Sequence, residues 1–253
     1  MMKIKKILVS QPKPESEKHS YSELAEKNNL KIDFRPFSQI EAVSAKEFRQ
    51  CRIEILLHSA VIFTSKTAID HFFRISEEMR IIIPDDMKYF CISESTAFYL
   101  QKYIVYRKRK ISYSCVGTFP DLMEYILKHR DEKFLLPLSN SYSEEIPQLL
   151  DKNKIKYTKA ILYHTVCSDL SDLSEINYDI LVFFSPSGIK SLLQNFPEFK
   201  QNDIKIATFG STTAKAAHDA GLRLDISAPM PNAPSMTMAL DQYIREFNKN
   251  SKK

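Results

Sequence analysis

Glycine is scarce in this sequence, with only Gly117, Gly188, Gly210 and Gly221 among 253 residues. Dinucleotide-binding loops and Walker loops need several closely spaced glycines, because the backbone there must approach the phosphates closely. None of these four positions supplies such a loop, so a nucleotide cofactor is not expected. A linker rich in glycine and serine is also lacking, and domain boundaries must be found from other signals.

Cysteine and histidine are few and scattered. The four cysteines are widely spaced, and no pair of cysteines and no Cys/His cluster has the spacing of a metal site. The sequence therefore predicts buried, reduced thiols and no metal. No Ser/His/Asp arrangement can be recognised either, and we expect each histidine to have a surface or core role. The residues concerned are Cys51, Cys91, Cys115, Cys167, His19, His58, His71, His129, His164 and His218.

Long hydrophobic runs are absent as well. The longest are "ILLHSAVIF" and "ILVFF", well short of the roughly 20 residues that a membrane-spanning helix needs. The apolar stretch in "MMKIKKILVSQP" is too short for a signal peptide. A cytoplasmic protein without membrane contact is therefore predicted. The hydrophobic fraction of 43% and the charged fraction of 26% are typical of a globular protein. The net charge of +5 would suit an anionic small molecule, but a basic surplus of this size is also common in proteins that bind nothing charged.

What the sequence does contain is an internal duplication. The stretch "LVFFSPSGIKSLL" (181–193) overlays "VIFTSKTAIDHFF" (61–73) without gaps. Both run from a buried-strand pattern through a polar turn into a helical pattern. The similarity continues beyond them, from 88–100 to 205–217 and from 112–127 to 225–240. One long unit of strand-helix steps therefore occurs twice.

A shorter strand-helix-strand unit also occurs twice, since "LAEKNNLK" (24–31) aligns with "LLDKNKIK" (149–156). Strands that alternate with helices in this way predict an α/β fold with two doubly wound parallel sheets. The chain reads short, long, short, long. Self-similarity leaves open whether a domain pairs each short unit with the following long unit or with the distant one. The β-patterned segments 31–37 and 155–166 are candidates for a connecting ribbon.

Each predicted turn between a strand and the following helix is rich in hydroxyl groups. The turns are residues 64–67, 93–96, 139–141, 185–188 and 210–213. Two interpretations stay open. Ser, Thr and Asn are the preferred helix N-caps, and Pro186 suits the first turn of a helix. Alternatively, the turns lie at the carboxyl ends of parallel strands and line a cleft with donors for carboxylates or phosphates.

The densest positive cluster is residues 106–110. A solvated loop, an anion-binding rim and a weak nucleic-acid patch are the three interpretations. Apart from Tyr103 and Tyr106, no aromatic residues accompany the charges at stacking spacing. Nucleic-acid binding is therefore not expected.

Five motifs occur in a consistent order along nearly the whole chain: "IFTS" (62–65), "ILYHT" (161–165), "FFSPSG" (183–188), "GSTTAKAAHDAGL" (210–222) and "APSMTMAL" (233–240). Together they resemble the uroporphyrinogen-III synthase family, in the form seen in Bacteroides-like bacteria. The resemblance implies a cytoplasmic, monomeric, cofactor-free enzyme of tetrapyrrole biosynthesis. Such enzymes cyclise hydroxymethylbilane to uroporphyrinogen III, with loss of water and inversion of the last pyrrole ring.

The resemblance also implies a domain arrangement. Family members have two flavodoxin-like domains joined by a two-stranded antiparallel linker. Carried over to this chain, residues 1–36 and 167–253 would form the first domain, and residues 37–166 the inserted second domain. A cleft between the two would hold the substrate, which carries eight carboxylates.

The family's tyrosine near the end of the second-domain strand corresponds to Tyr163. The resemblance implies that its phenol donates a proton to the departing hydroxyl; a structural, half-buried tyrosine is the other interpretation. The expected substrate-binding residues are those of the turns, namely Thr64, Ser65, Lys66, Ser93, Thr96, Ser139, Asn140, Ser185, Ser187, Gly188, Gly210, Thr212 and Thr213.

Three positions depart from the family pattern. The usual Pro-Arg after "FTS" is Lys66-Thr67, the proline of "GPTTA" is Ser211, and the second-domain "GN" turn reads Ser139-Asn140. These departures motivate an alternative hypothesis, in which the chain is a two-lobed tetrapyrrole-binding protein derived from the synthase and has lost turnover.

Overall fold

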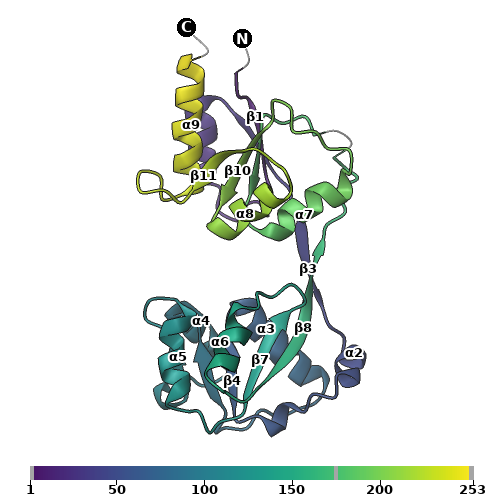
Figure 1. The fold of residues 1–253 in the computed structure, drawn as a ribbon, viewed down its shortest axis with the longest axis vertical. Coiled ribbons are helices and arrows are strands. Elements are labelled where there is room, and N and C mark those ends of the chain that lie inside the picture. Colours follow the sequence, from purple (N-terminus) through teal and green to yellow (C-terminus); the bar gives the residue numbers. More distant parts are fainter. Residues whose placement is uncertain (1–2, 174–175, 251–253) are drawn as a thin grey trace. The chain divides into compact units, whose positions relative to one another are not determined.

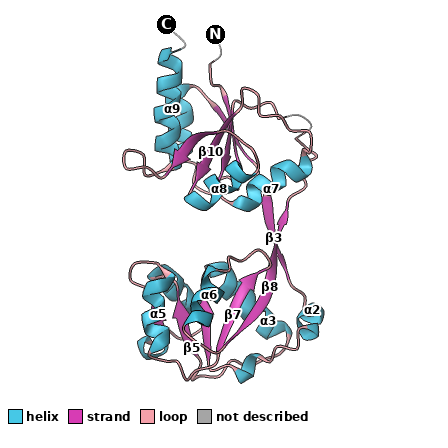
Figure 2. Ribbon diagram, viewed as in Figure 1, coloured by secondary structure: helices cyan, strands magenta, loops and turns pink. Residues whose placement is uncertain are grey.

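The computed structural model describes residues 3–173 and 176–250. The chain divides into two compact units (Figures 1 and 2). Unit 1 comprises Met1–Gln39 and Val166–Lys253, and unit 2 comprises Ile40–Thr165. Among the described residues, no helix is both long enough and apolar enough to cross a membrane.

Unit 1 is built on a five-stranded sheet with the spatial order β11-β10-β9-β1-β2, in which every neighbouring pair is parallel. Numbered along the chain within the unit, this is the 2-1-3-4-5 order of flavodoxin-like folds. The strands are β1 (Lys6–Val9), β2 (Lys31–Phe34), β9 (Ile180–Phe183), β10 (Lys205–Phe209) and β11 (Leu224–Ala228). The helices are α1 (Ser20–Asn28), α7 (Pro186–Asn195), α8 (Ser211–Asp219) and α9 (Met236–Asn250).

Helices cover both faces of this sheet. On one face, Ile7 and Val9 of β1 pack in the same cluster as Leu240 of α9. On the other face, Leu8 packs in a cluster with Leu192 of α7. A strand that is buried on both faces needs apolar side chains at successive positions, which explains the unbroken run "ILV" at 7–9.

Unit 2 carries a six-stranded sheet with the order β3-β8-β7-β4-β5-β6. The strands are β3 (Ser38–Ala42), β4 (Ala60–Phe63), β5 (Lys88–Cys91), β6 (Ile111–Tyr113), β7 (Phe134–Ser139) and β8 (Tyr157–Cys167). The α-helices are α2 (Ala45–Gln50), α3 (Lys66–Glu78), α4 (Glu94–Tyr99), α5 (Phe119–Leu127) and α6 (Glu145–Lys152). Short 3-10 turns are η1 (Ile55–Leu57), η2 (Leu100–Lys102) and η3 (Lys108–Lys110).

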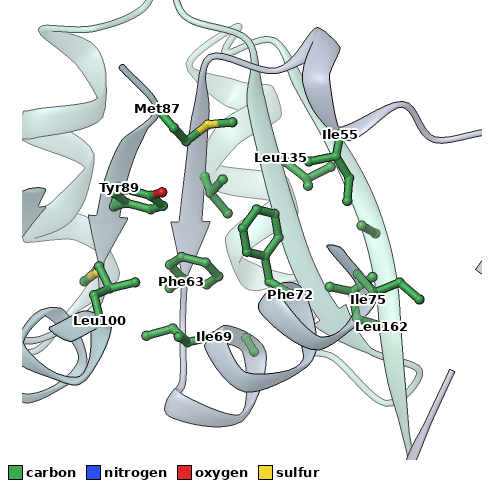
Figure 3. Packing of buried hydrophobic residues seen from close by; sticks show 14 of the residues in the cluster. Ile55, Phe63, Ile69, Phe72, Ile75, Met87, Tyr89, Leu100, Leu135 and Leu162 are labelled. Atoms are coloured by element: carbon green, nitrogen blue, oxygen red, sulfur yellow. The ribbon is translucent and has the colours of Figure 1, made fainter. Parts of the chain in front are cut away.

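The core of unit 2 is aromatic where α3 meets the sheet (Figure 3). The rings of Phe63 on β4 and Phe72 on α3 meet edge to face with their centroids 5.5 Å apart. Tyr89 on β5 stacks on the other side of Phe63 at 6.1 Å. Such pairs add to the stabilisation from burial alone. The opposite face of the same sheet is covered by α5 and α6.

The strand orders answer the question that self-similarity left open. Unit 1 combines the first short unit (β1-α1-β2) with the second long unit, which begins at β9. Unit 2 combines the first long unit, which begins at β4, with the second short unit (β7-α6-β8). Apart from the added edge strand β3, the strands of unit 2 have the same spatial order as those of unit 1. The chain begins unit 1 with the short unit and unit 2 with the long unit.

The connecting ribbon is antiparallel, as the resemblance implied. The Val43 N–H donates to the Leu162 carbonyl at 3.1 Å, and the Ser168 N–H donates to the Phe37 carbonyl at 2.9 Å. Residue numbers therefore increase along one segment while they decrease along the other, as in any antiparallel pair. Strand β3 lies beside β8 in the sheet.

The choice of 31–37 as one ribbon strand was wrong. Strand β2 (Lys31–Phe34) pairs in parallel with β1 instead. Ile32 and Phe34 pack against the core of unit 1, which fixes this pairing. The ribbon strand is β3, whose side chains are mostly exposed and therefore give no hydrophobic pattern that the sequence could reveal.

Candidate functional site

The predicted turn residues lie at the carboxyl ends of the parallel strands, the side on which ligands bind in doubly wound sheets. Such sites form at the carboxyl ends of the strands, beside the point where the strand order reverses. This point lies between β1 and β9 in unit 1 and between β7 and β4 in unit 2. The turns that leave β9, β4 and β7 carry Ser185, Ser65 and Asn140 respectively.

Three of the turn serines are helix N-caps. The Oγ atoms of Ser65, Ser93 and Ser185 accept hydrogen bonds from the backbone N–H three residues further on, at 3.0, 3.3 and 3.3 Å. The capping interpretation is confirmed for these hydroxyls. A capping hydroxyl uses one lone pair and keeps its own proton, so it can still donate to a ligand.

The turn after β9 is a chain of hydroxyl groups. Ser185 Oγ lies 2.8 Å from Ser187 Oγ, and Ser187 Oγ lies 3.3 Å from Ser38 Oγ. Both turn serines are half-buried. The arrangement is neutral and donor-rich, which suits an acceptor such as a carboxylate.

Gly188 allows close packing beneath this turn. A Cβ at this position would lie 3.2 Å from the Phe183 ring and 3.6 Å from Ser10 Oγ. Glycine therefore lets α7 approach the end of β9 and the first residue after β1. The two turns that flank the switch point of unit 1 meet at this glycine.

The turn after β10 depends on another glycine. Gly210 has φ of +88° and caps α8 without a side chain; this conformation favours glycine over any other residue. Of the two threonines that follow, Thr212 is exposed and Thr213 is buried. In unit 2, Thr96 is likewise buried, with its Oγ1 3.0 Å from Ser93 Oγ. The exposed Thr212 is therefore the more accessible donor in its turn.

Asn140 ties the turn after β7 to the end of β8. Its backbone N–H donates to the Tyr163 carbonyl at 3.2 Å, and its Oδ1 accepts from the Thr165 N–H at 2.8 Å. Ser139 Oγ accepts from the Ser141 N–H at 3.3 Å. The side-chain oxygen of Asn140 is thus used to position backbone, and its amide NH₂ is the group left to act as a donor.

Tyr163 is placed by an irregularity in the sheet. The register between β7 and β8 shifts so that Leu138 pairs with Ile161 and Ser139 with Tyr163. Because of this bulge, Leu162 and Tyr163 both join the core cluster on the α3 side, where regular alternation would send them to opposite faces. The side chain is only 8% exposed, so it is packed in place, level with Ser139 at the carboxyl end of β7.

His71 of α3 covers Tyr163. Their rings stack with centroids 4.9 Å apart and an interplanar angle of 20°. Arg74, one turn further along α3, donates from Nε to His71 Nδ1 at 3.2 Å. Burial, followed by the charge of Arg74, lowers the pKa of His71. Sequence reasoning missed this contact, because His71 and Tyr163 are far apart along the chain and no motif contains both.

Lys66 lies at the start of α3 and is exposed. Its Nζ is 5.4 Å from the centre of the Tyr99 ring, and Tyr99 donates to the Asp70 carboxylate at 2.9 Å. A cation at a helix N-terminus is unfavourable for the helix dipole. An anionic ligand bound there would remove this repulsion.

The remaining histidines have the structural roles that were predicted. His19 caps α1. His58 lies 3.0 Å from the Glu54 carbonyl and 2.8 Å from Thr158 Oγ1, while His164, His129 and His218 neighbour Glu47, the Tyr125 carbonyl and Asp219. No three of the described His, Cys, Asp or Glu side chains are grouped so that they could hold a metal ion.

All four cysteines are free, but the prediction that they are buried was wrong for Cys51 and Cys115, which are exposed. Cys51 ends the short surface helix α2, and Cys115 lies in the turn after β6. Cys167 is half-buried. Cys91 fits the prediction, and burial raises its pKa to about 12, which makes it an unreactive thiol.

The basic run 106–110 lies away from the carboxyl-end turns. Arg107 and Lys110 line a cavity of about 540 Å³ that reaches Glu77 near the end of α3. Tyr106 stacks on Phe98 with centroids 5.5 Å apart. Lys108 and Arg109 are exposed, in agreement with a solvated loop.

Comparison with known proteins identifies the family. The family described as "Uroporphyrinogen-III synthase HemD" matches residues 19–238. The uroporphyrinogen-III synthase of Saccharomyces cerevisiae is 28% identical over 116 residues, covering 40% of this chain and 42% of the yeast protein. This chain thus aligns with less than half of that relative's length.

Two solved structures share the fold over almost the whole chain. Uroporphyrinogen-III synthetase from Helicobacter pylori has a TM-score of 0.63 at 17% identity, and the match covers 96% of this chain and 100% of that one. A mutant uroporphyrinogen III synthase from Thermus thermophilus has a TM-score of 0.59 at 14% identity, covering 96% and 99%. Since the family match extends over most of the sequence, this chain belongs to the uroporphyrinogen-III synthase family.

Proposed function

We propose that this protein is a uroporphyrinogen-III synthase, which converts hydroxymethylbilane into uroporphyrinogen III. The observation that carries the proposal is the position of Tyr163. A sheet bulge and the stacked ring of His71 hold this tyrosine in the middle of β8, opposite Ser139 at the carboxyl end of β7 and beside the Asn140 turn. The family membership and the residue type at this position support the same activity.

The reaction requires a proton donor beside the hydroxyl group that leaves. The hydroxyl of hydroxymethylbilane leaves as water only if it is protonated, and the pyrrole carbon that forms the last ring bond gives up a proton when the macrocycle closes. We assign the donation to Tyr163, since a phenol can donate to the departing oxygen. The reaction is neutral in protons overall, so the residue returns to its starting state without a cofactor.

Substrate binding is assigned to the turns in each unit. The eight carboxylates need many donors and a positive field. Helix N-termini supply both through their backbone N–H groups and dipoles. Ser185, Ser187 and Thr212 contribute hydroxyls in unit 1, and Lys66 contributes a charge in unit 2. Much of the rate enhancement would then come from holding the flexible chain of pyrroles in a folded conformation.

The isomer assay tests this proposal. Hydroxymethylbilane closes spontaneously to the I isomer, so the fraction of isomer III measures catalysis by the protein. We expect isomer III to dominate when purified protein is added to hydroxymethylbilane generated in situ. Isomer I alone, together with saturable binding of the bilane, would show a tetrapyrrole-binding protein without turnover and would overturn the proposal.

The proposal extends to the setting in which the enzyme works. We place it in the cytoplasm as a monomer, with hydroxymethylbilane as its small-molecule partner and no nucleic acid or cofactor involved. The family, the short hydrophobic runs and the modest net charge of +5 support this assignment. Light scattering of the purified chain tests the monomer, for which 29.3 kDa is expected.

A further inference from the structure

We infer that Arg74 and His71 are positioning residues that fix Tyr163 in the orientation needed for proton donation. The inference rests on the proposed function, because it assigns these residues to the same reaction. Neither side chain belongs to the motifs that suggested the family, and both lie on α3, one turn apart. Three kinds of contact support it.

The first contact is with backbone. Arg74 Nη2 donates to the Leu162 carbonyl at 3.3 Å and to the Val43 carbonyl at 2.8 Å. Leu162 directly precedes Tyr163 at the bulge. A planar guanidinium with its donors in a fixed fork can hold two carbonyls at once. Arg74 therefore holds the peptide from which the Tyr163 side chain departs.

The second contact is with the ring that covers Tyr163. Arg74 Nε–H points to His71 Nδ1, which must then be an acceptor. A neutral imidazole with a lone pair on Nδ1 carries its proton on Nε2. The hydrogen bond thereby selects one tautomer and one ring orientation. That ring lies 4.9 Å from the ring of Tyr163 and nearly parallel to it.

The third contact anchors Arg74 itself. Its Nη1 pairs with Glu78 Oε1 at 2.6 Å, one helical turn away. Arg74 thus donates to four separate acceptors, which are the Glu78 carboxylate, His71 Nδ1 and the backbone carbonyls of Val43 and Leu162. The guanidinium acts on Tyr163 by two routes, one through the main chain and one through the stacked imidazole.

The duplicated helix in unit 1 lacks this arrangement. The positions of α7 that correspond to His71 and Arg74 are Ser191 and Gln194. Ser191 is buried, and its carbonyl accepts from Asn195 at 2.9 Å. A helix of the same fold and register thus packs well without an imidazole or a guanidinium at these sites. The fold therefore does not require a histidine and an arginine at positions 71 and 74.

A double-mutant cycle tests the inference. His71→Ala and Arg74→Ala are made in the wild type and in Tyr163→Phe, and kcat and KM for isomer III formation are measured. We expect each change to lower kcat by about tenfold to a hundredfold in the wild type, because small misplacements of a reacting group have effects of this size. KM should change less, by under about threefold, and in the Tyr163→Phe background the same changes should lower kcat by less than about twofold.

Glu77→Gln is the matched control, since it removes an exposed carboxylate of α3 directly before Glu78 and leaves the bonds of Arg74 to Glu78, His71 and the two carbonyls in place. Its kcat should stay within about twofold of the wild type. If His71→Ala or Arg74→Ala does not fold, His71→Phe or Arg74→Lys respectively replaces it in the same cycle. An equal loss of kcat in both backgrounds, or no loss in either, would overturn the inference.

A measurement without turnover keeps this inference separate from the proposed function. Nitrogen chemical shifts of His71 should report the Nε2–H tautomer in the wild type and a mixture in Arg74→Ala; a wild-type mixture would contradict the role of Arg74. A wild type that forms no isomer III overturns the proposed function and the inference together. A wild type that forms isomer III, without coupling between His71 and Tyr163, overturns the inference alone.

Discussion

The two copies of the strand-turn-helix step, 61–73 in unit 2 and 181–193 in unit 1, have nearly the same structure. Residues 61–69 and 181–189 follow the same succession of buried, half-buried and exposed positions. Each helix is capped by a serine, Ser65 or Ser185, at 3.0 or 3.3 Å. The backbone and its packing are therefore held in common.

The side chains that follow the caps differ. Unit 1 has Pro186, Ser187 and Gly188, a neutral turn in which hydroxyls bond to each other. Unit 2 has Lys66, Thr67 and Ala68, with a charge at the helix start. Further along the two helices, only α3 of unit 2 carries His71, which stacks on Tyr163, and Arg74, which bonds to His71. Under the proposed function, unit 1 serves binding, while unit 2 serves both binding and proton transfer.

The largest expected effect is that of Tyr163→Phe, which would show whether chemistry is confined to unit 2. Removal of the phenol hydroxyl should lower kcat by about a hundredfold or more, which is the usual range for loss of a general acid. Tyr157→Phe is the control, because Tyr157 lies on the same strand and its hydroxyl donates to the Pro147 carbonyl at 3.4 Å. Isomer III formation by stopped-time assay measures both. Unchanged turnover in Tyr163→Phe would remove this residue from the mechanism.

The second effect concerns the space beneath each turn. Gly188→Val should lower the free energy of unfolding by about 1–3 kcal/mol, because a Cβ there already lies 3.2 Å from Phe183 and the added methyls overpack the site. The corresponding residue in unit 2 is Ala68, which is fully buried. Ala68→Gly should cost about 1 kcal/mol through lost helix propensity. Urea unfolding followed by circular dichroism measures both changes. Full stability of Gly188→Val would show that the close approach in unit 1 has no structural importance.

The caps are expected to be equivalent, which is the third test. Ser65→Ala and Ser185→Ala should each cost about 1 kcal/mol, since each removes one acceptor for a helix N–H. Ser211→Ala is the control: Ser211 is exposed, and its helix is capped by Gly210, so the change should stay within about 0.5 kcal/mol. Thermal and urea unfolding measure the difference. Costs that differ by more than about 1 kcal/mol between the two caps would break the structural equivalence of the turns.

Much of the fold could be predicted because duplication doubles the signal. The matching of 61–73 with 181–193 located two strands, two caps and two helices, and all of them are present. The ribbon was misassigned, because Ile32 and Phe34 alternate as a strand in either setting, and only the packing of unit 1 decides which strand they pair with.

The site was predictable only in part. Residues in turns such as Ser65 and Ser185 stand next to recognisable strands, so their position follows from local patterns. Tyr163 was found only through the family resemblance. Its neighbours His71 and Arg74 were missed. The ring of Tyr163 faces α3 because of the bulge at Ser139, and the hydrophobic pattern does not reveal a bulge.

The smallest expected effect comes from exchanging the first helical residues. Lys66→Pro gives unit 2 the residue of unit 1, at a helix position where proline is accepted and after Ser65, whose extended backbone (φ −160°, ψ 161°) suits a following proline. The free energy of unfolding should rise by about 0.4–1 kcal/mol, because proline restricts the unfolded chain and suits the backbone at this position. KM should rise several-fold, because a charge near the bound carboxylates is lost, while kcat stays nearly constant.

The reciprocal change, Pro186→Lys, is the matched control. It should lower the free energy of unfolding by about 0.4–1 kcal/mol, because proline restricts the unfolded chain. Steady-state kinetics and urea unfolding of both variants test the exchange. If KM stays at the wild-type value in Lys66→Pro, the charge takes no part in binding. The two turns would then differ in function only through Tyr163 and the helix residues that contact it.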